Sequence, residues 1–282
     1  MRLELQANAK INLGLRILGK RSDGYHDLIT LFQRVSLADR VSLEPISSDI
    51  KYLGPNLTVD PKDNLCVRAG LAFQEAFGSN RGVEINLEKM IPVGAGLGGG
   101  SSDAAAVLRG MARLYGVDTG SEELRQIAVQ VGSDVPFFLS DYSAAIGEGM
   151  GEKLTSILGL DQHVFVTLLW PGFSISTKWA YKSADKSLTF RKKNSKIIVR
   201  QYCSYRDGIP TAELINDFEG PVFAAHPELA RARDELLQRG AETAGLCGSG
   251  SALFGIFDGE AEAGAAARGW RSPWLSFVCR PI

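Results

Sequence analysis

The chain has almost no net charge and no long apolar run. Its 31 lysine and arginine residues nearly balance its 32 aspartate and glutamate residues, which leaves a formal net charge of −1 at pH 7. Proteins that bind nucleic acids or anionic membranes usually carry a basic excess, so the sequence gives no sign of either partner. No segment approaches the ~20 apolar residues of a membrane-spanning helix, and the N-terminal segment lacks the apolar run of a signal peptide. A cytoplasmic protein is therefore expected.

Cysteine is also scarce. The four cysteines show no C-x-x-C spacing, and they stand at Cys66, Cys203, Cys247 and Cys279. This pattern indicates neither a zinc site nor a disulfide framework, and it suits free thiols in a reducing compartment. With 282 residues, 45% hydrophobic and 22% charged, the chain is long enough for one large domain or two ordinary ones with a sizeable core.

What the chain does have is the glycine-rich stretch PVGAGLGGGSSDAA, residues 92–105. A predicted strand precedes it at 83–91, and helical spacing follows it to Leu114. Glycines let a backbone take positive φ and approach a ligand closely, so their N–H groups can converge on an anion at the helix start. Ser101 and Ser102 are expected to add hydroxyls and to cap this helix. The stretch predicts a polyphosphate site, although it lacks the lysine of a Walker loop.

Three other segments place polar residues beside apolar ones, and each has two interpretations. Lys10 in ANAKINLGL is either an edge-strand lysine that discourages aggregation or a functional cation. Tyr25 and His26, in DGYH after a charged turn, are either surface residues or ligand contacts. Asp134, in GSDVPFFL before Pro136, is either a cap or a catalytic carboxylate. The residues alone leave these alternatives open.

The remaining pattern gives a coarse order of elements. Residues 3–18 are predicted to form a strand, a break and a second strand, and residues 35–62 hairpin strands. A helix is expected over 61–77, with Pro61 and Asp63 at its N-terminus and Asn64 as a plain cap, and another over 121–132, with Ser121 marking its start. Residues 214–240 predict helix-entry structure and then one long amphipathic helix. A second glycine-rich element at 248–251 forms either a small anion site or a tight turn. The basic segment 183–210 is interpreted only as a solvated face or a loop.

Together these segments resemble the GHMP kinases, the family of galactokinase, homoserine kinase and mevalonate kinase. ANAKINL is similar to the family's opening segment PAKINL, with Asn8 where the family has proline, and GSDVPFF is similar to its GxDVPFF segment. The phosphate loop of the family is matched at Pro92, Gly96, Leu97, Gly98, Ser101 and Ser102. The resemblance covers nearly the whole chain and is weakest over 183–210.

The resemblance implies an α+β fold with two domains. Residues 1–152 would form an ATP-binding N-terminal domain like domain 2 of ribosomal protein S5. Residues 153–282 would form a C-terminal domain with a ferredoxin-like fold.

The resemblance also implies roles for individual residues. Lys10 and Asp134 would be catalytic, with Lys10 as the cation that pairs with Asp134. Asn64 would contact the adenine end of ATP, whereas Lys89 would lie near the base or be an ordinary exposed strand lysine. The substrate would be bound by Asn12, Tyr25, His26, Thr177 and Tyr181. The phosphates of ATP would be bound by Pro92, Val93, Gly94, Ala95, Gly96, Leu97, Gly98, Gly99, Gly100, Ser101 and Ser102.

The DGYH motif narrows the expected substrate. It is similar to the cytidine pocket of one branch of the family, and Tyr25 could stack on a pyrimidine while His26 bonds to its edge. The resemblance then implies ATP-dependent phosphorylation of the 2-hydroxyl of diphosphocytidyl methylerythritol, with Mg²⁺, in the non-mevalonate route to isoprenoid precursors. It does not identify the Mg²⁺ ligands. A monomer or weak homodimer with no nucleic-acid or membrane partner is expected.

Two alternatives stay open. A sister kinase of the family could act on another alcohol, and a catalytically silent relative could bind nucleotide without chemistry. A nucleic-acid binder that uses the basic segment is disfavoured by the net charge of −1.

Overall fold

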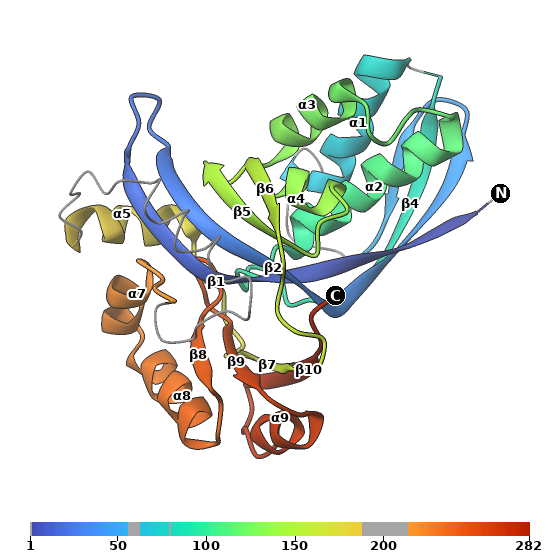
Figure 1. The fold of residues 1–282 in the computed structure, drawn as a ribbon. Helices are drawn as coiled ribbons and strands as arrows, with labels where there is room; N and C mark the ends of the chain where they lie inside the picture. Colours follow the sequence, from blue (N-terminus) through green and yellow to red (C-terminus); the bar gives the residue numbers. More distant parts are fainter. Residues whose placement is uncertain (1, 56–62, 79, 188–213) are drawn as a thin grey trace. The chain divides into compact units, whose positions relative to one another are not determined.

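The computed structural model describes residues 2–55, 63–78, 80–187 and 214–282 (Figure 1). Packing divides the chain into two compact units. Unit 1 comprises Met1–Ala9, Leu37–Ile91 and Gly98–Tyr142, and unit 2 comprises Lys10–Ser36, Pro92–Leu97 and Ser143–Ile282. None of the helices in the described ranges has the length and apolar character needed to cross a membrane.

Two long strands each contribute to both units. They are β1 (Leu3–Lys20) and β2 (His26–Ile46), and they pair with one another. The predicted break within 3–18 is wrong, because β1 runs unbroken and is buried continuously from Ala9 to Leu15. Because these strands contribute residues to both units, each compact unit is made of several separate segments of the chain. The predicted domains, 1–152 and 153–282, are contiguous. The predicted boundary stays a prediction.

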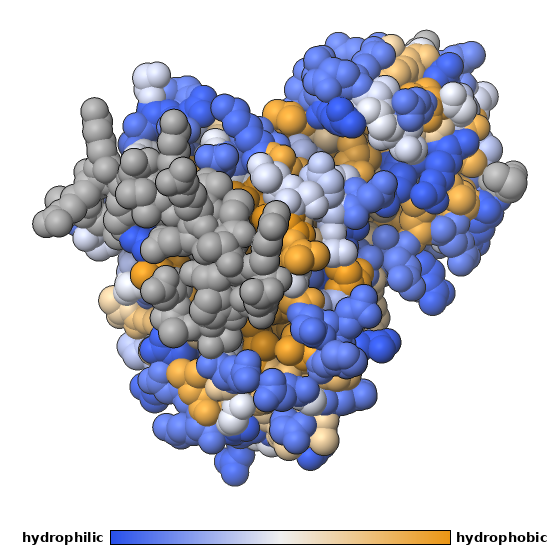
Figure 2. Space-filling view, viewed as in Figure 1, coloured by the Kyte–Doolittle hydropathy of each residue, from blue (hydrophilic) through white to orange (hydrophobic). Residues whose placement is uncertain are grey.

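Unit 1 consists of four described helices and a small group of strands. In it, β4 (Gly82–Glu88) pairs antiparallel with the second half of β2, and β3 (Ile50–Leu53) pairs parallel with β4. The helices are α1 (Leu65–Phe77), α2 (Gly99–Tyr115), α3 (Glu122–Val131) and α4 (Val135–Leu139). The predicted cap of α1 is confirmed, because Asn64 accepts a hydrogen bond from the Cys66 N–H group. Ser121 caps α3 in the same way by accepting from the Leu124 N–H group. Figure 2 shows mainly hydrophilic residues over α1 and α3.

Unit 2 contains two groups of strands. The first half of β2 pairs antiparallel with β5 (Ala144–Gly149), which pairs antiparallel with β6 (Lys153–Ile157) and so forms a hairpin with it. The other sheet has the order β10-β7-β9-β8 with antiparallel neighbours; its strands are β7 (Phe165–Trp170), β8 (Thr243–Leu246), β9 (Leu253–Phe257) and β10 (Leu275–Cys279).

Four described helices accompany the second sheet. They are α5 (Thr177–Ser187), α7 (Glu219–Ala225), α8 (Pro227–Gln238) and α9 (Glu260–Ala267). The order of strands, helices and strands from β7 to β10 is that of a ferredoxin-like fold, as expected. The single long helix predicted within 214–240 is wrong, because the chain breaks at His226 and restarts with Pro227 at the first position of α8.

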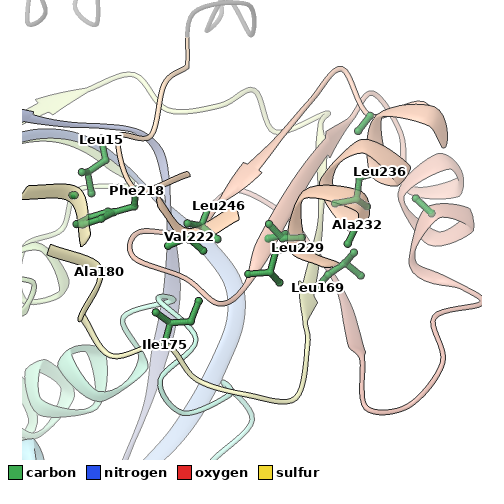
Figure 3. Close-up of a cluster of buried hydrophobic side chains, with 14 of the residues drawn as sticks. Leu15, Leu169, Ile175, Ala180, Phe218, Val222, Leu229, Ala232, Leu236 and Leu246 are labelled. Atoms are coloured by element: carbon green, nitrogen blue, oxygen red, sulfur yellow. The ribbon is translucent and has the colours of Figure 1, made fainter. Parts of the chain in front are cut away.

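A hydrophobic core holds unit 2 together (Figure 3). Leu15 of β1 and Ala180 of α5 join it, and Phe218 and Val222 contribute from around α7. The sheet and α8 contribute Leu169, Leu229, Ala232, Leu236 and Leu246. The ring of Tyr181 packs against this cluster and contacts Phe218 edge-on, with ring centroids 4.9 Å apart. The core therefore fixes the helix from which Tyr181 projects.

Candidate active site

Lys10 lies on β1 with only 4% of its surface exposed. Its ammonium group donates to Asn12 Oδ1 at 2.5 Å and to the backbone oxygen of Gly96 at 3.0 Å, and it lies 5.6 Å from the ring centroid of Phe32. A lysine that discourages aggregation must point into solvent, so the burial of Lys10 removes that interpretation. Lys10 is instead a positive charge held against the glycine-rich loop.

Asn12 is held in one orientation. Its Nδ2 group donates to Thr30 Oγ1 at 2.7 Å, and the Thr30 hydroxyl donates to the carbonyl oxygen of Gly14 at 2.8 Å. The amide oxygen of Asn12 is thereby aimed at Lys10. Sequence reasoning missed Thr30, whose neighbours in LITLF mark it only as a strand residue.

The first half of the loop, Pro92–Leu97, belongs to unit 2. Gly96 has a φ of +81°, and a Cβ placed there would lie 2.1 Å from the carbonyl oxygen of Cys247, so only glycine fits. The backbone N–H of Lys10 donates to the carbonyl oxygen of Leu97 at 3.0 Å, and the backbone N–H of Ala252 donates to the carbonyl oxygen of Ala95 at 2.9 Å. The loop is thus fixed by β1 on the one hand and by the second glycine-rich element on the other.

The second glycine-rich element therefore belongs to this site. A Cβ at Gly248 would come within 3.0 Å of Asn12 Oδ1 and 3.4 Å of Lys10 Nζ. Buried Asn216 holds the element by donating to the carbonyl oxygens of Leu246 and Gly248, at 2.9 and 2.8 Å. The sequence marked Asn216 only as helix-entry structure; its partners lie some thirty residues further along the chain.

The second half of the loop, from Gly98, belongs to unit 1. Gly98 caps α2 with a φ of +73°, and the helix begins at Gly99. The expectation that Ser101 and Ser102 cap the helix is wrong, because both lie within its first turn. The first N–H groups of a helix have no intrahelical acceptor, so Gly99, Gly100 and Ser101 present donors at the positive end of the α2 dipole. This geometry suits an anion.

Asp134 lies half-buried directly before α4. Its side chain forms no capping hydrogen bond to that helix within the described residues, so the structure gives no support to a capping role. Asp134 and Lys10 belong to different units, and the expected pairing of their side chains stays a prediction.

Arg109 of α2 was missed by sequence reasoning. Its Nη2 group donates to the carbonyl oxygens of Phe138, Leu139 and Ser140, at 3.1, 2.6 and 3.0 Å. These three carbonyl oxygens lie at the C-terminal end of α4, and Asp134 directly precedes the N-terminal end of the same helix. Arg109 therefore ties Asp134's helix to the helix that follows the phosphate loop.

A second set of the expected residues meets in unit 2. The buried ring of His26 stacks on Tyr181, with centroids 4.6 Å apart and planes 14° from parallel, and its Nε2 lies 2.7 Å from Asp185 Oδ1. Thr177, at the start of α5, shares a hydrogen bond of 3.1 Å with Ser249. Tyr25 is 63% exposed. The structure thus joins His26 to Tyr181, links Thr177 to the second glycine-rich element, and leaves Tyr25 accessible.

Asp185, also missed by the sequence, is the hydrogen-bond partner that orients the ring of His26. Burial raises the pKa of Asp185, but hydrogen bonds from His26 and Lys20 outweigh it, so that pKa lies below its usual range. An ionised carboxylate only accepts hydrogen bonds, so the Nε2 atom of His26 carries the proton.

Lys89 is not an exposed strand lysine. Its side chain is 12% exposed, and its ammonium group bonds to the carboxylates of Asp39 and Asp103. Asn64 remains on unit 1 as the cap of α1, and its expected contact with adenine stays a prediction.

No group of three or more His, Cys, Asp or Glu side chains suited to a metal ion occurs in the ranges that the structure describes. Mg²⁺ that arrives with a nucleotide keeps several waters and needs few protein ligands besides the phosphates.

Comparisons with known proteins cover nearly all of the chain. The N-terminal domain model of the GHMP kinases matches residues 64–142, and the C-terminal model matches residues 203–275. A 4-diphosphocytidyl-2-C-methyl-D-erythritol kinase of Prosthecochloris aestuarii is 42% identical over 94% of this chain and 92% of its own length. The kinase of the same name from Chlorobaculum tepidum is 41% identical over 93% and 92%.

Solved structures agree with these matches. A crystal structure of 4-(cytidine 5'-diphospho)-2C-methyl-D-erythritol kinase superposes with a TM-score of 0.80 at 36% identity, covering 98% of each chain. Homoserine kinase from Cytophaga hutchinsonii, at 17% identity and a TM-score of 0.77 over 100% and 95%, shares the fold. The chain therefore belongs to the GHMP kinase family, among the 4-diphosphocytidyl-2-C-methyl-D-erythritol kinases.

Proposed function

We propose that this chain transfers the γ-phosphoryl group of ATP to the 2-hydroxyl of 4-diphosphocytidyl-2-C-methyl-D-erythritol, a step of the non-mevalonate route to isoprenoid precursors. The observation that carries the proposal is buried Lys10, bonded at once to Asn12 and to the carbonyl of Gly96 in the phosphate loop. A buried cation at a glycine-rich loop is suited to charge that develops on a transferring phosphoryl group.

The nucleotide is held by the loop 92–102. Backbone N–H groups at the start of α2 bind phosphate oxygens, and the helix dipole adds positive potential equivalent to about half an elementary charge. Asn64 contacts the adenine. Mg²⁺ bound with the nucleotide neutralises phosphate charge, and the hydroxyls of Ser101 and Ser102 would hold it.

Asp134 accepts the proton of the substrate hydroxyl. The hydroxyl oxygen forms a bond to the γ-phosphorus, the bond from that phosphorus to the bridging oxygen of ADP breaks, and the proton passes to the carboxylate. Lys10 offsets the negative charge of the transferring group. Phosphoryl transfer depends mainly on positioning and electrostatics, so these two side chains and the loop suffice as the protein's part.

The cytidine end of the substrate is bound in unit 2. Tyr181 and His26 already lie ring against ring, which gives an aromatic surface with a polar edge. Exposed Tyr25 is available to stack on the pyrimidine, while Asn12 and Thr177 contact the rest of the substrate. The proposed assembly is a monomer or weak homodimer in the cytoplasm, with a small-molecule substrate and no nucleic-acid or membrane partner.

The test is substrate-dependent release of ADP from Mg–ATP. Wild type should turn over, and Asp134→Asn should be slower by about 10²-fold or more, because the base is lost. Asp234→Asn, a matched change on α8 at a side chain that is 55% exposed, should leave the rate unchanged. Wild type that binds ATP without turnover on this substrate would refute the proposal in favour of a sister kinase or a silent nucleotide binder.

A further inference from the structure

Asn216 lies in a short segment of unit 2 that runs alongside β1. The backbone N–H of Leu15 donates to the carbonyl oxygen of Ile215 at 2.9 Å, and the N–H of Asp217 donates to the carbonyl oxygen of Leu15 at 2.9 Å. The Asp217 carboxylate also accepts the N–H of Ile17, at 2.8 Å. These bonds fix the backbone on each side of Asn216 to β1.

The Asn216 side chain uses its amide in full. The residue has 6% of its surface exposed, and its Oδ1 atom accepts the Phe218 N–H at 3.0 Å. This bond sets the orientation of the amide, so the two hydrogens of Nδ2 serve the carbonyl oxygens of Leu246 and Gly248, at 2.9 and 2.8 Å. Figure 3 shows Phe218 and Leu246 in the same hydrophobic cluster. One buried side chain therefore holds the carbonyls on both sides of Cys247.

These two carbonyls belong to the backbone that lies against Lys10. Gly248 has a φ of +56°, and a Cβ there would come within 3.0 Å of Asn12 Oδ1 and 3.4 Å of Lys10 Nζ. The carbonyl oxygen of Cys247 lies close to Gly96, whose own carbonyl oxygen accepts from Lys10 Nζ at 3.0 Å. The second glycine-rich element thus borders the space that the Lys10 ammonium occupies.

The bonding of this element favours a tight turn over an anion site. The N–H groups of Cys247, Gly250 and Ala252 donate to the carbonyl oxygens of Ala252, Cys247 and Ala95, at 2.8, 2.9 and 2.9 Å. An anion site made of backbone needs successive N–H groups that turn toward one point. Since these donors are used within the chain, the element is suited to support its neighbours.

We propose that Asn216 is a positioning residue for Lys10. It holds the second glycine-rich element against the Lys10–Asn12 pair, and it acts on the reaction through Gly248 and Lys10. Without its two donors, two buried carbonyls lose their partner, the turn moves, and the ammonium loses its fixed place at the loop. The inference rests on the proposed function only where it assigns Lys10 to catalysis.

The first experiment measures how fast an amine-reactive succinimidyl ester modifies Lys10 in the full chain, followed by mass spectrometry. Lys10 should react at least about fivefold faster in Asn216→Ala than in wild type, because the backbone beside it is released. Exposed Lys153 on β6 should react equally in both proteins. The matched control is Thr167→Val, which removes another buried donor, to the Ala263 carbonyl, and should leave the labelling of Lys10 unchanged.

Steady-state kinetics test whether this placement serves catalysis. Asn216→Ala should lower kcat about tenfold and leave the KM for ATP within about threefold, because the loop keeps its backbone bonds to Lys10 and Ala252. In a Lys10→Met background, Asn216→Ala should lower kcat by less than about twofold, because the residue through which it acts is gone. Thr167→Val should leave kcat unchanged.

Asn216→Asp is a second variant that keeps the size of the side chain and the acceptor for Phe218. It can donate to no more than one of the two carbonyls, so it should show the same changes to a smaller extent. Unchanged labelling of Lys10 in a folded Asn216 variant would overturn the inference, as would an equal loss of kcat with and without Lys10. Wild type without turnover on the proposed substrate, together with faster labelling in the variant, would refute the proposed function and leave the placement of Lys10 intact.

Discussion

Lys10 and Asn12 are two residues apart on β1, so their side chains leave the strand on the same face. This spacing explains why the ammonium group and the amide oxygen meet at 2.5 Å. Sequence alone could place both residues on one face, but it could not decide whether that face is buried. This face is buried because the backbones of Gly96 and Gly248, which lie far away in the sequence, approach the two side chains in the fold.

Asp185 gives a prediction at the residue scale. Asp185→Ala removes the acceptor that keeps the proton on His26 Nε2, so the imidazole loses its fixed orientation. The KM for the cytidine-bearing substrate should rise several-fold, while the KM for ATP should stay within about twofold. Steady-state kinetics with each substrate varied in turn checks this.

The control for Asp185 is its neighbour on the same helix. Lys186→Ala changes an exposed side chain of α5 and should leave both KM values at the wild-type level. Equal KM values for the cytidine substrate in wild type and Asp185→Ala would show that Asp185 has no part in recognition.

At the scale of elements, α2 and α4 work as a pair. Arg109 of α2 holds three carbonyl oxygens at the end of α4. Arg109→Met should lower kcat about five- to tenfold with little change in the KM for ATP, because Asp134 shifts while the phosphate loop stays. Loss of these hydrogen bonds should also cost on the order of 1–3 kcal/mol of unfolding free energy.

Kinetics and urea denaturation measure the two effects of Arg109→Met. Arg113→Met, one turn further along α2 at an exposed position, supplies the matched control. A loss of stability with an unchanged kcat would make Arg109 purely structural.

The helices and the phosphate loop were predictable from the sequence, whereas the long-range contacts between side chains were not. Helices α1 and α3 follow from local signals, since Asn64 and Ser121 cap them through bonds spanning two and three residues. The phosphate loop follows from its glycines. By contrast, Lys89 meets Asp39 across fifty positions, and Arg109 meets α4 across about thirty. The local sequence pattern indicates caps and turns, but it does not indicate which distant group becomes the partner of a buried side chain.

At the scale of the whole molecule, Asp103 makes stability depend on pH. Its folded pKa of about 7 lies above the ordinary value of 3.8, so the unfolded chain binds fewer protons between these values. Stability therefore falls as pH rises through this range and is lowest above pH 7. The melting temperature of wild type should drop by several degrees between pH 6 and pH 8.5, and that of Asp103→Asn should drop less.

Thermal unfolding scans of the two proteins at matched ionic strength check this prediction. A wild-type melting temperature that rises over the same interval, or an identical drop in both proteins, would mean that Asp103 stays ionised in the folded state throughout.

The order of secondary structure and the family pattern were accessible from the sequence, but the division into units was not. The strands β1 and β2 supply residues to both units, and the loop 92–102 changes units between Leu97 and Gly98. The sequence suggested contiguous domains, because no local sequence pattern shows that one strand contributes residues to two compact units.

The central claim is tested most directly by identifying the product. Phosphorus NMR of a reaction with Mg–ATP and 4-diphosphocytidyl-2-C-methyl-D-erythritol should show one new phosphomonoester for each ADP, with the diphosphate of the substrate retained. Asp134→Asn should form it at least ~10²-fold more slowly. Formation of ADP with inorganic phosphate alone, or no ADP from an enzyme that binds ATP, would contradict the account.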